Sequence, residues 1–146
     1  MNGTVVAINV TAVNGSPLLP VQSVRTIAGR GLEGDRNFGK PGPGQNVTLI
    51  EAEAIEAVQR DYKIELKAAD SRRNIVTRGV ALNHLVGREF TVGKARLRGV
   101  QLCEPCGYLA KLTQEEVRKA LIHRGGLNCD VLTEGEIRVG DNVCVG

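Results

Sequence analysis

Two of the four cysteines form a motif with known chemistry, because Cys103 and Cys106 stand in C-x-x-C spacing. Thiols at this spacing serve in zinc sites, in redox pairs, or as one reactive thiol with a neighbour. A structural zinc ion takes four ligands, often from two such pairs. The other candidate ligands in the chain form no second close pair: Cys129, Cys144, His84 and His123.

The redox and single-thiol interpretations differ in what must surround the motif. A redox pair needs a helix N-terminus that lowers the thiol pKa, and here a predicted strand ends at Leu102 and a short helix follows. In the third interpretation, Cys106 is the reactive thiol of a pocket and Cys103 is its neighbour. The alternative for any cysteine is a small buried apolar group. We expect that role for Cys129 and Cys144, which stand in Val-rich strands.

Basic residues form three short clusters on separate predicted loops. The clusters are Gly34-Asp35-Arg36, Arg72-Arg73-Asn74 and His123-Arg124-Gly125-Gly126. Arginine makes planar, paired hydrogen bonds to phosphate or carboxylate, and glycine lets a ligand approach the backbone. Together the clusters predict one binding site for a small anion. The alternative is that the arginines pair with acidic residues at the strand ends, such as Asp35 and Asp70.

The elements that must position these residues are mostly short strands. Apolar alternation and β-branched residues predict strands over residues 4–13, 21–27, 45–50, 73–76, 89–92, 95–102, 127–132 and 137–145. Helix-forming residues predict a helix over 51–60, a helical turn over 81–87 and one or two helices over 109–122, where Thr113 begins a capping box. A glycine-dense loop fills residues 29–44, and loops of that length are commonly functional.

The predicted fold class is mainly β. Helices do not alternate regularly with strands, which argues against a doubly wound parallel sheet. A closed or partly open, barrel-like sheet with two or three peripheral helices would hide the strand edges. The 18 valines and 18 glycines suit short strands joined by tight turns. A length of 146 residues, 42% of them hydrophobic and 24% charged, predicts one globular domain over residues 1–146.

Composition and charge argue against several functional classes. A formal net charge of +3 with 3% aromatic residues and no Trp offers no stacking platform for nucleic acid. No apolar run reaches the roughly 18 residues that a membrane-spanning helix needs. The first residues, Met1 to Thr4, lack the basic and apolar regions of a signal peptide. We therefore expect a cytoplasmic protein whose cysteines are free thiols rather than disulfides.

The order of the short motifs resembles that of the MOSC domain, the C-terminal domain of molybdenum cofactor sulfurases. The matching pieces are Gly34-Asp35-Arg36, Gln45–Ile50, Arg72–Val76, Leu82–Gly87, Phe90–Gly93, Cys103–Cys106 and Gly140-Asp141. Each piece alone is weakly specific, whereas their order over residues 34–141 is much more specific. The chain resembles the small stand-alone members of the family.

The resemblance implies a β-barrel-like domain with one hallmark cysteine, which corresponds to Cys106. In larger relatives, such as the mitochondrial amidoxime-reducing component, that cysteine ligates molybdenum and basic residues hold the pterin phosphate. Stand-alone members have been proposed to carry sulfur as a persulfide or to bind a pterin-type cofactor. Pyridoxal phosphate is associated with the family through the separate aminotransferase-like domain of the sulfurases. Cys103 would then resolve a persulfide on Cys106 by thiol exchange.

These implications define the candidate site and its partners. The reactive residues would be Cys106 and Cys103, and Cys106 would ligate the metal. The contacts to the anionic cofactor would be Asp35, Arg36, Arg72, Arg73, Asn74 and Arg124. Partners would be a molybdoenzyme, a sulfurtransferase or an electron carrier. The alternatives are a molybdenum-dependent reductase of N-hydroxylated compounds and a non-catalytic module that binds a molybdoenzyme. The chain lacks the companion domains of the larger relatives, so we do not expect an autonomous cysteine desulfurase.

Overall fold

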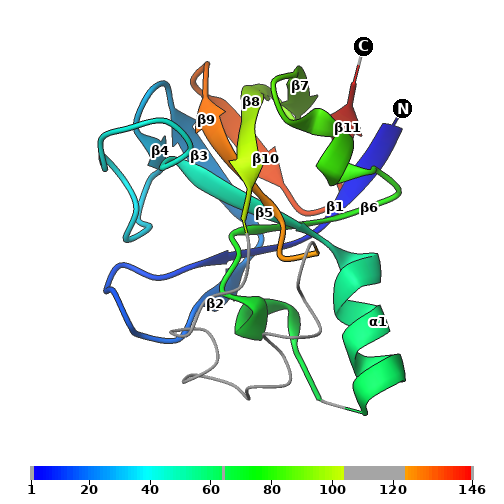
Figure 1. Cartoon of the computed structure of the whole chain (residues 1–146). Coiled ribbons are helices and arrows are strands. Elements are labelled where there is room, and N and C mark those ends of the chain that lie inside the picture. Colours follow the sequence, from blue (N-terminus) through cyan, green and yellow to red (C-terminus); the bar gives the residue numbers. More distant parts are fainter. Residues whose placement is uncertain (1, 64, 104–123, 146) are drawn as a thin grey trace.

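A ring of hydrogen-bonded strands forms the centre of the molecule (Figure 1). The structure, a computed structural model, describes residues 2–63, 65–103 and 124–145. Within these ranges, seven strands make the ring: β1 (Asn2–Val10), β5 (Val47–Glu51), β6 (Ile75–Arg78), β7 (Glu89–Val92), β8 (Ala95–Leu102), β9 (Leu127–Val131) and β11 (Asn142–Cys144). Their order around the ring is β11-β7-β8-β9-β5-β6-β1.

The ring closes because β1 pairs with β6 on one side and with β11 on the other. Neighbouring strands of this ring are antiparallel except β5 and β6, where Leu49 lies beside Ile75. Helix α1 (Ala52–Tyr62) joins these two parallel strands. The sheet is therefore a closed barrel, which confirms the mainly β, barrel-like prediction.

Three further strands form a smaller sheet next to the barrel (Figure 1). They are β3 (Ser23–Ile27), β4 (Gly31–Leu32) and β10 (Gly135–Arg138). A short strand, β2 (Leu19–Val21), lies along β1. The strand predicted over 21–27 is thus two strands, because the chain leaves the β1 edge at Gln22 and joins the smaller sheet. On β3, Val24 and Thr26 are the buried residues.

The strand predicted over 137–145 is also divided, into β10 and β11. Gly140 has a φ of 96°, a left-handed conformation that glycine adopts without strain. The Asp141 carboxylate accepts a hydrogen bond from the Arg138 N–H over 2.8 Å, as aspartate often does in turns. The Gly140-Asp141 pair therefore ends one strand and starts the next.

Aliphatic side chains fill both sides of the barrel wall. Leu49 and Ile75 are fully buried in the cluster that fills the barrel. Ile50 and Val76, one residue further along, belong to a second cluster under α1. Because side chains alternate along a strand, β5 and β6 bury one face in the barrel and the other against the helix. Five helix residues are buried on that face: Ala52, Ala54, Ile55, Ala57 and Val58.

The helical predictions are met in part. Helix α1 starts one residue later than predicted and ends at Tyr62, and its C-cap Lys63 is left-handed with a φ of 55°. The helical turn expected over 81–87 is the 3-10 helix η2 (Leu82–Leu85), and a further 3-10 helix, η1 (Ala68–Ser71), precedes β6. The helices predicted over 109–122, with Thr113, lie outside the described residues. In the part of the chain that is described, no helix is long and apolar enough to cross a membrane.

Candidate functional site

Three arginines of the predicted clusters come together where β6 begins. The Arg36 Nη2 donates a hydrogen bond to the Arg72 carbonyl oxygen over 3.3 Å, and Arg73 is the next residue. Arg72 and Arg73 are only 9% and 8% exposed, and the Arg36 side chain is 10% exposed. Burying a charged group is unfavourable unless protein or ligand groups compensate it. This arginine cluster (Arg36, Arg72 and Arg73) therefore consists of three buried arginines, whose charges the surrounding groups must compensate.

Arg72 occupies a strained backbone position within the arginine cluster. Its φ is 64°, in the left-handed region that a large side chain seldom adopts. Such a conformation costs about 1–3 kcal/mol and persists where the surroundings hold it, often at functional sites. Here the Arg72 Nη1 donates a hydrogen bond to the Ser16 carbonyl oxygen over 2.5 Å, and the Arg72 N–H donates to the Ala69 carbonyl oxygen over 3.2 Å.

Asp35 places a carboxylate directly against the arginine cluster. Its Oδ1 lies 3.0 Å from the Arg36 Nη1 and accepts a hydrogen bond from the Thr11 N–H over 3.3 Å. Its Oδ2 accepts a hydrogen bond from the Asn37 N–H over 3.3 Å. The Asp35 side chain is 1% exposed, so its structural role is to fix the Gly34-Asp35-Arg36 turn against the end of β1.

Asn74 is fully buried, and its amide joins three strands. The Asn74 Oδ1 accepts hydrogen bonds from the Thr48 N–H and hydroxyl, each over 3.2 Å. The Asn74 Nδ2 donates to the Asn9 carbonyl oxygen over 3.1 Å. The sequence predicts this residue as a cofactor contact. In the structure its amide links β1, β5 and β6 directly beside the arginine cluster.

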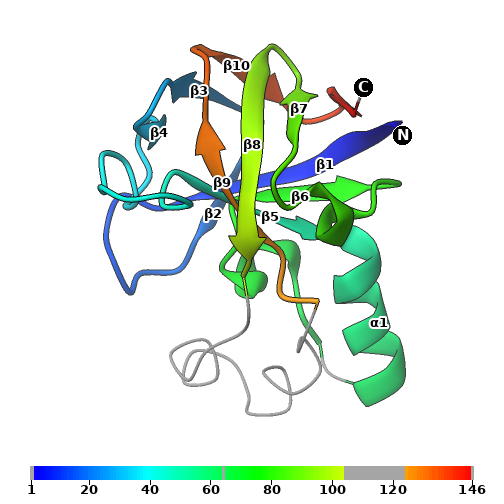
Figure 2. The ribbon, with the colours of Figure 1, turned by 45° about the horizontal axis from the view of Figure 1, so that its top comes forward.

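Arg73 connects the arginine cluster to the cysteine motif. Its Nε donates a hydrogen bond to the Gly125 carbonyl oxygen over 2.6 Å, and its Nη2 donates to the Cys103 carbonyl oxygen over 3.5 Å. Two views place the end of β8 near the start of β6 (Figures 1 and 2). The structure thus brings Cys103 to the arginine cluster, whereas Cys106 and His123 lie outside the described residues.

Arg124 differs from the arginine cluster in its exposure. Arg124 is exposed on the surface, and its positive charge affects the pKa of two carboxyl groups, those of Asp61 and Glu51. The hydrogen bond from Arg60 is the largest cause that lowers the pKa of the Asp61 carboxyl, and the charge of Arg124 lowers this pKa further. It also lowers the pKa of the Glu51 carboxyl, although other effects outweigh it there. Arg124 is the neighbour of Gly125, whose carbonyl oxygen accepts a hydrogen bond from Arg73.

Glu51 is the last residue of β5, and the ionisation of its carboxyl makes the free energy of unfolding depend on pH. Burial raises the pKa of its carboxyl from 4.5, and the nearby Glu53 carboxylate adds to the rise. Because the folded state then binds the proton more tightly than the unfolded state, stability falls as the pH rises through the folded pKa. We expect Glu51→Gln to raise the free energy of unfolding at pH 7 by less than about 1 kcal/mol, since the group is partly hydrated.

The gain from Glu51→Gln should vanish below pH 4.5, where the carboxyl is protonated in the folded state. Urea unfolding at pH 7 and pH 4 measures both values, with Glu65→Gln at an exposed position as the control. A stabilisation equal at the two pH values would show that the ionisation of Glu51 is not its cause.

The other cysteines have opposite environments. Cys129 on β9 is fully buried, as expected, and this burial raises the pKa of its thiol far above the ordinary range. Cys144 on β11 is exposed, so the prediction of a buried group is wrong. The reason is strand alternation, because Val143 and Val145 on either side are buried and turn Cys144 outward. Within the described ranges, no group of three or more His, Cys, Asp or Glu side chains is placed to hold a metal ion.

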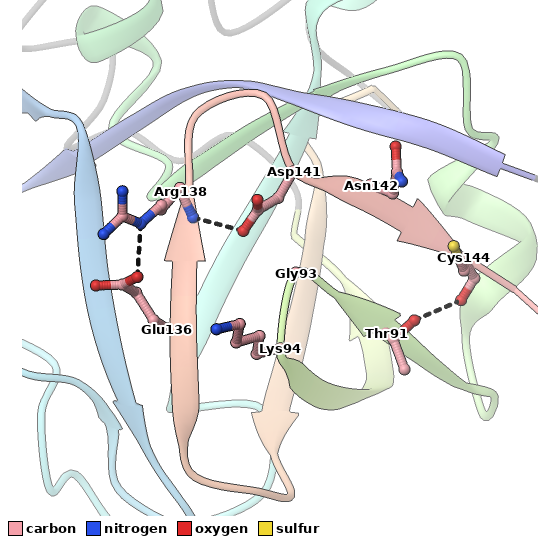
Figure 3. Close-up of a pocket in the computed structure, with 8 residues that line it drawn as sticks. All are labelled: Thr91, Gly93, Lys94, Glu136, Arg138, Asp141, Asn142 and Cys144. Atoms are coloured by element: carbon pink, nitrogen blue, oxygen red, sulfur yellow. Dashed lines mark hydrogen bonds and ion pairs between the residues drawn. The ribbon is translucent and has the colours of Figure 1, made fainter.

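A cavity of about 460 Å³ opens at the other end of β8 (Figure 3). It is lined by Thr91, Gly93, Lys94, Glu136, Arg138, Asp141, Asn142 and Cys144. Lys94 precedes β8 and Cys103 follows it, so strand geometry separates the two by roughly 30 Å. Arg138 in this cavity is largely exposed and forms an ion pair with Glu136. We place the candidate site at the arginine cluster instead, because three of the predicted anion contacts lie there beside Cys103, whereas the lining of the cavity contains none of the predicted site residues.

Comparison with known proteins identifies the family and the fold. A family model described as the MOSC domain matches residues 35–144. Among solved structures, the YUAD protein from Bacillus subtilis gives a TM-score of 0.86 at 14% identity, covering 98% of this chain and 94% of that chain. YiiM from Geobacillus stearothermophilus gives 0.79 at 22% identity over 99% and 75% of the two chains. YiiM from Escherichia coli gives 0.73 at 19% identity over 100% and 70%. These structures share the fold, and no curated protein sequence matches the chain.

Proposed function

This chain belongs to the MOSC domain family, and we propose that it binds a molybdenum–pterin-type cofactor through the arginine cluster and Cys106. The observation that carries the proposal is the gathering of Arg36, Arg72 and Arg73, each about nine-tenths buried, beside Cys103. A phosphate group suits such a site, because arginine forks bind phosphate with paired, charge-assisted hydrogen bonds. Arg36 and Arg72 would hold the phosphate, and Asp35 and Asn74 would hold those arginines in place.

Cys106 supplies the second half of the proposed site. Thiolate is a soft ligand that suits molybdenum, and positive charge beside Cys106 would favour the thiolate over the thiol. The donor set of the chain therefore fits the group, with phosphate on the arginines and metal on the cysteine. Bound there, the cofactor would supply two-electron redox chemistry, which a reductase of N-hydroxylated compounds would use with an electron-carrier partner. Arg124, an exposed residue next to Gly125, would be a further contact to the anionic cofactor.

Sulfur transfer is a second candidate, because a second thiol, Cys103, stands three residues before Cys106 in the sequence. The Cys106 thiolate would attack the outer sulfur of a donor persulfide and release the donor thiolate. The sulfur on Cys106 would pass to an acceptor nucleophile, or leave as hydrosulfide when Cys103 attacks Cys106 and forms a disulfide. This reaction needs a sulfurtransferase as donor and no metal.

Molybdenum retention tests the proposed function. Purified protein is mixed anaerobically with freshly released molybdenum cofactor, separated by gel filtration, and analysed for molybdenum. We expect the wild type to retain the metal, Cys106→Ser to lose it, and Arg72→Gln to bind at least about tenfold more weakly, as for a lost charged hydrogen bond. Arg138→Gln, in the exposed cavity, is the matched control and should retain the metal like the wild type.

Three outcomes distinguish the candidates. Retention that depends on Cys106 supports the cofactor site, and competition by pyridoxal phosphate would show whether the arginine cluster accepts other phosphates. No retention by any variant would contradict it, and a mass increase of one sulfur atom on Cys106 after treatment with a persulfide donor would then support sulfur transfer. If neither occurs and Cys106 reacts slowly with iodoacetamide, the chain acts as a binding module.

A further inference from the structure

Two buried oxygen atoms at one end of the barrel have no hydrogen-bond partner within the described part of the chain. They are the Thr77 Oγ1 on β6 and the Glu53 Oε1 at the start of α1. Nearly all buried polar atoms in native proteins are hydrogen-bonded, so an unpaired one calls for an explanation such as an ion. We propose that this end of the barrel binds a hydrated divalent cation of the Mg²⁺ type, held by Glu51, Glu53 and Thr77. This cation site shares no residue with the proposed cofactor site.

The strand register places Glu51 and Thr77 side by side. They are opposite residues of the parallel strands β5 and β6, so their side chains leave the same face of the sheet, from backbones about 4.8 Å apart. Thr77 shares this face with Ile75, which belongs to the barrel core. Arg78 points to the other face, where it donates hydrogen bonds to Glu56 of α1. The fully buried Thr77 hydroxyl therefore lies on the Glu51 side of the barrel wall.

Glu53 brings a second carboxylate to this end of the barrel. Its Oε2 accepts a hydrogen bond from the Gly79 N–H over 2.9 Å, two residues beyond Thr77. Two views show the start of α1 next to the end of β6 (Figures 1 and 2). Burial raises the pKa of the Glu51 carboxyl, and the Glu53 carboxylate raises it further, so the two acids are close enough to repel each other. A cation between them would relieve this repulsion.

The proposed donors are all oxygen atoms, which select a hard cation. Ca²⁺ takes six to eight oxygen ligands, whereas Mg²⁺ keeps several of its waters and is commonly bound through one or two carboxylates. Two carboxylates and one hydroxyl therefore suit hydrated Mg²⁺ better than Ca²⁺. The charges of Arg124 and His84 act on Glu51 in the opposite sense to a carboxylate and oppose a cation. We therefore expect weak binding, with a Kd of about 1 mM, as in the weaker cation sites of proteins.

Thermal unfolding in Mg²⁺ tests the cation site on the full chain. We expect about 10 mM MgCl₂ to raise the Tm of the wild type by at least about 2 °C relative to NaCl of equal ionic strength, because a ligand that binds only the folded state stabilises it. Glu53→Gln should lose this rise, and Thr77→Val should lose at least half of it. Glu65→Gln removes the same charge at an exposed position. It is the matched control and should keep the full rise.

Thr77→Val also separates cation binding from folding. Valine has nearly the shape of threonine, and a hydroxyl without a partner has no hydrogen bond to lose. In metal-free buffer the Tm of this variant should therefore be no lower than that of the wild type. Mn²⁺, which suits oxygen ligands as Mg²⁺ does, gives a direct measure of binding through the electron paramagnetic resonance signal of the free ion. We expect Thr77→Val to bind Mn²⁺ about tenfold more weakly than the wild type.

Three results would overturn the cation site. They are an equal Mg²⁺-dependent rise in Tm in the wild type, Glu53→Gln and Thr77→Val, no binding of Mn²⁺ by the wild type, and a lower Tm of Thr77→Val in metal-free buffer. The last would show that the hydroxyl has a partner in the folded protein. None of these measurements involves molybdenum or Cys106, so the cation site and the proposed function can fail separately.

Discussion

Gly126→Ala is expected to destabilise the fold by about 4 kcal/mol or more, a size reserved for a few mechanisms such as steric overlap in the core. A Cβ on Gly126 would lie 2.0 Å from the Leu49 carbonyl oxygen and 3.5 Å from the Ile50 Cα. Backbone atoms of a paired strand cannot move aside as a flexible side chain can. The φ of 114° adds strain for any residue with a Cβ. Thermal unfolding should show a fall in Tm of roughly 8–16 °C.

Gly87→Ala separates the two causes of that loss. Gly87 also has a left-handed φ, of 78°, but no atom beyond its chain neighbours lies within 4 Å of the place that a Cβ would take. Its substitution should therefore cost only about 1–2 kcal/mol of backbone strain. Equal losses at Gly87 and Gly126 would contradict the close approach of Gly126 to β5. That approach matters for the site, because the Gly126 carbonyl oxygen also accepts the hydrogen bond from Cys103.

The hairpin of β7 and β8 shows what local sequence can predict. Its strands lie at the predicted bounds, 89–92 and 95–102. A glycine, Gly93, marks the turn at Gly93-Lys94 in the sequence, and in the structure this glycine adopts a left-handed φ of 57°. Alternation also determined the outward position of Cys144, but the Val-rich context pointed to burial instead. The period of the neighbouring valines is therefore a better guide than the composition around a residue.

The arginine cluster shows what local sequence does not determine. Its members are predicted as anion contacts, and their burial depends on ring closure, which brings the β1–β2 loop, the 33–38 turn and the start of β6 together. Their partners at Ser16, Cys103 and Gly125 are backbone carbonyl oxygens, which every residue has. No residue type marks such a partner, so the sequence does not predict these three contacts. Asn74 is predicted as a ligand contact, and the sequence does not predict that its amide also joins three strands.

Asp35→Ala is expected to cost about 3–5 kcal/mol, because removing one member of a buried ion pair leaves the other charge uncompensated. The carboxylate accepts hydrogen bonds from the Thr11 and Asn37 N–H groups as well as from Arg36. The double variant Asp35→Ala, Arg36→Met removes both charges. Its loss should be smaller than the sum of the two single losses by at least about 1 kcal/mol, measured by urea unfolding as a double-mutant cycle. Losses that add within about 0.5 kcal/mol would show that the pair is not coupled.

The same variant tests whether the arginine cluster attracts anions. Asp35 offsets one of three neighbouring positive charges, so it holds the Arg36 turn in place while it weakens the field that an anion would experience. In Asp35→Ala, phosphate should compensate the guanidinium that has lost its carboxylate, because a ligand that binds only the folded state raises stability with its concentration. The rise in Tm with inorganic phosphate should therefore be larger in Asp35→Ala than in the wild type, and absent from Asp35→Ala, Arg36→Met. A rise of the same size in all three proteins would mean that phosphate acts elsewhere on the surface.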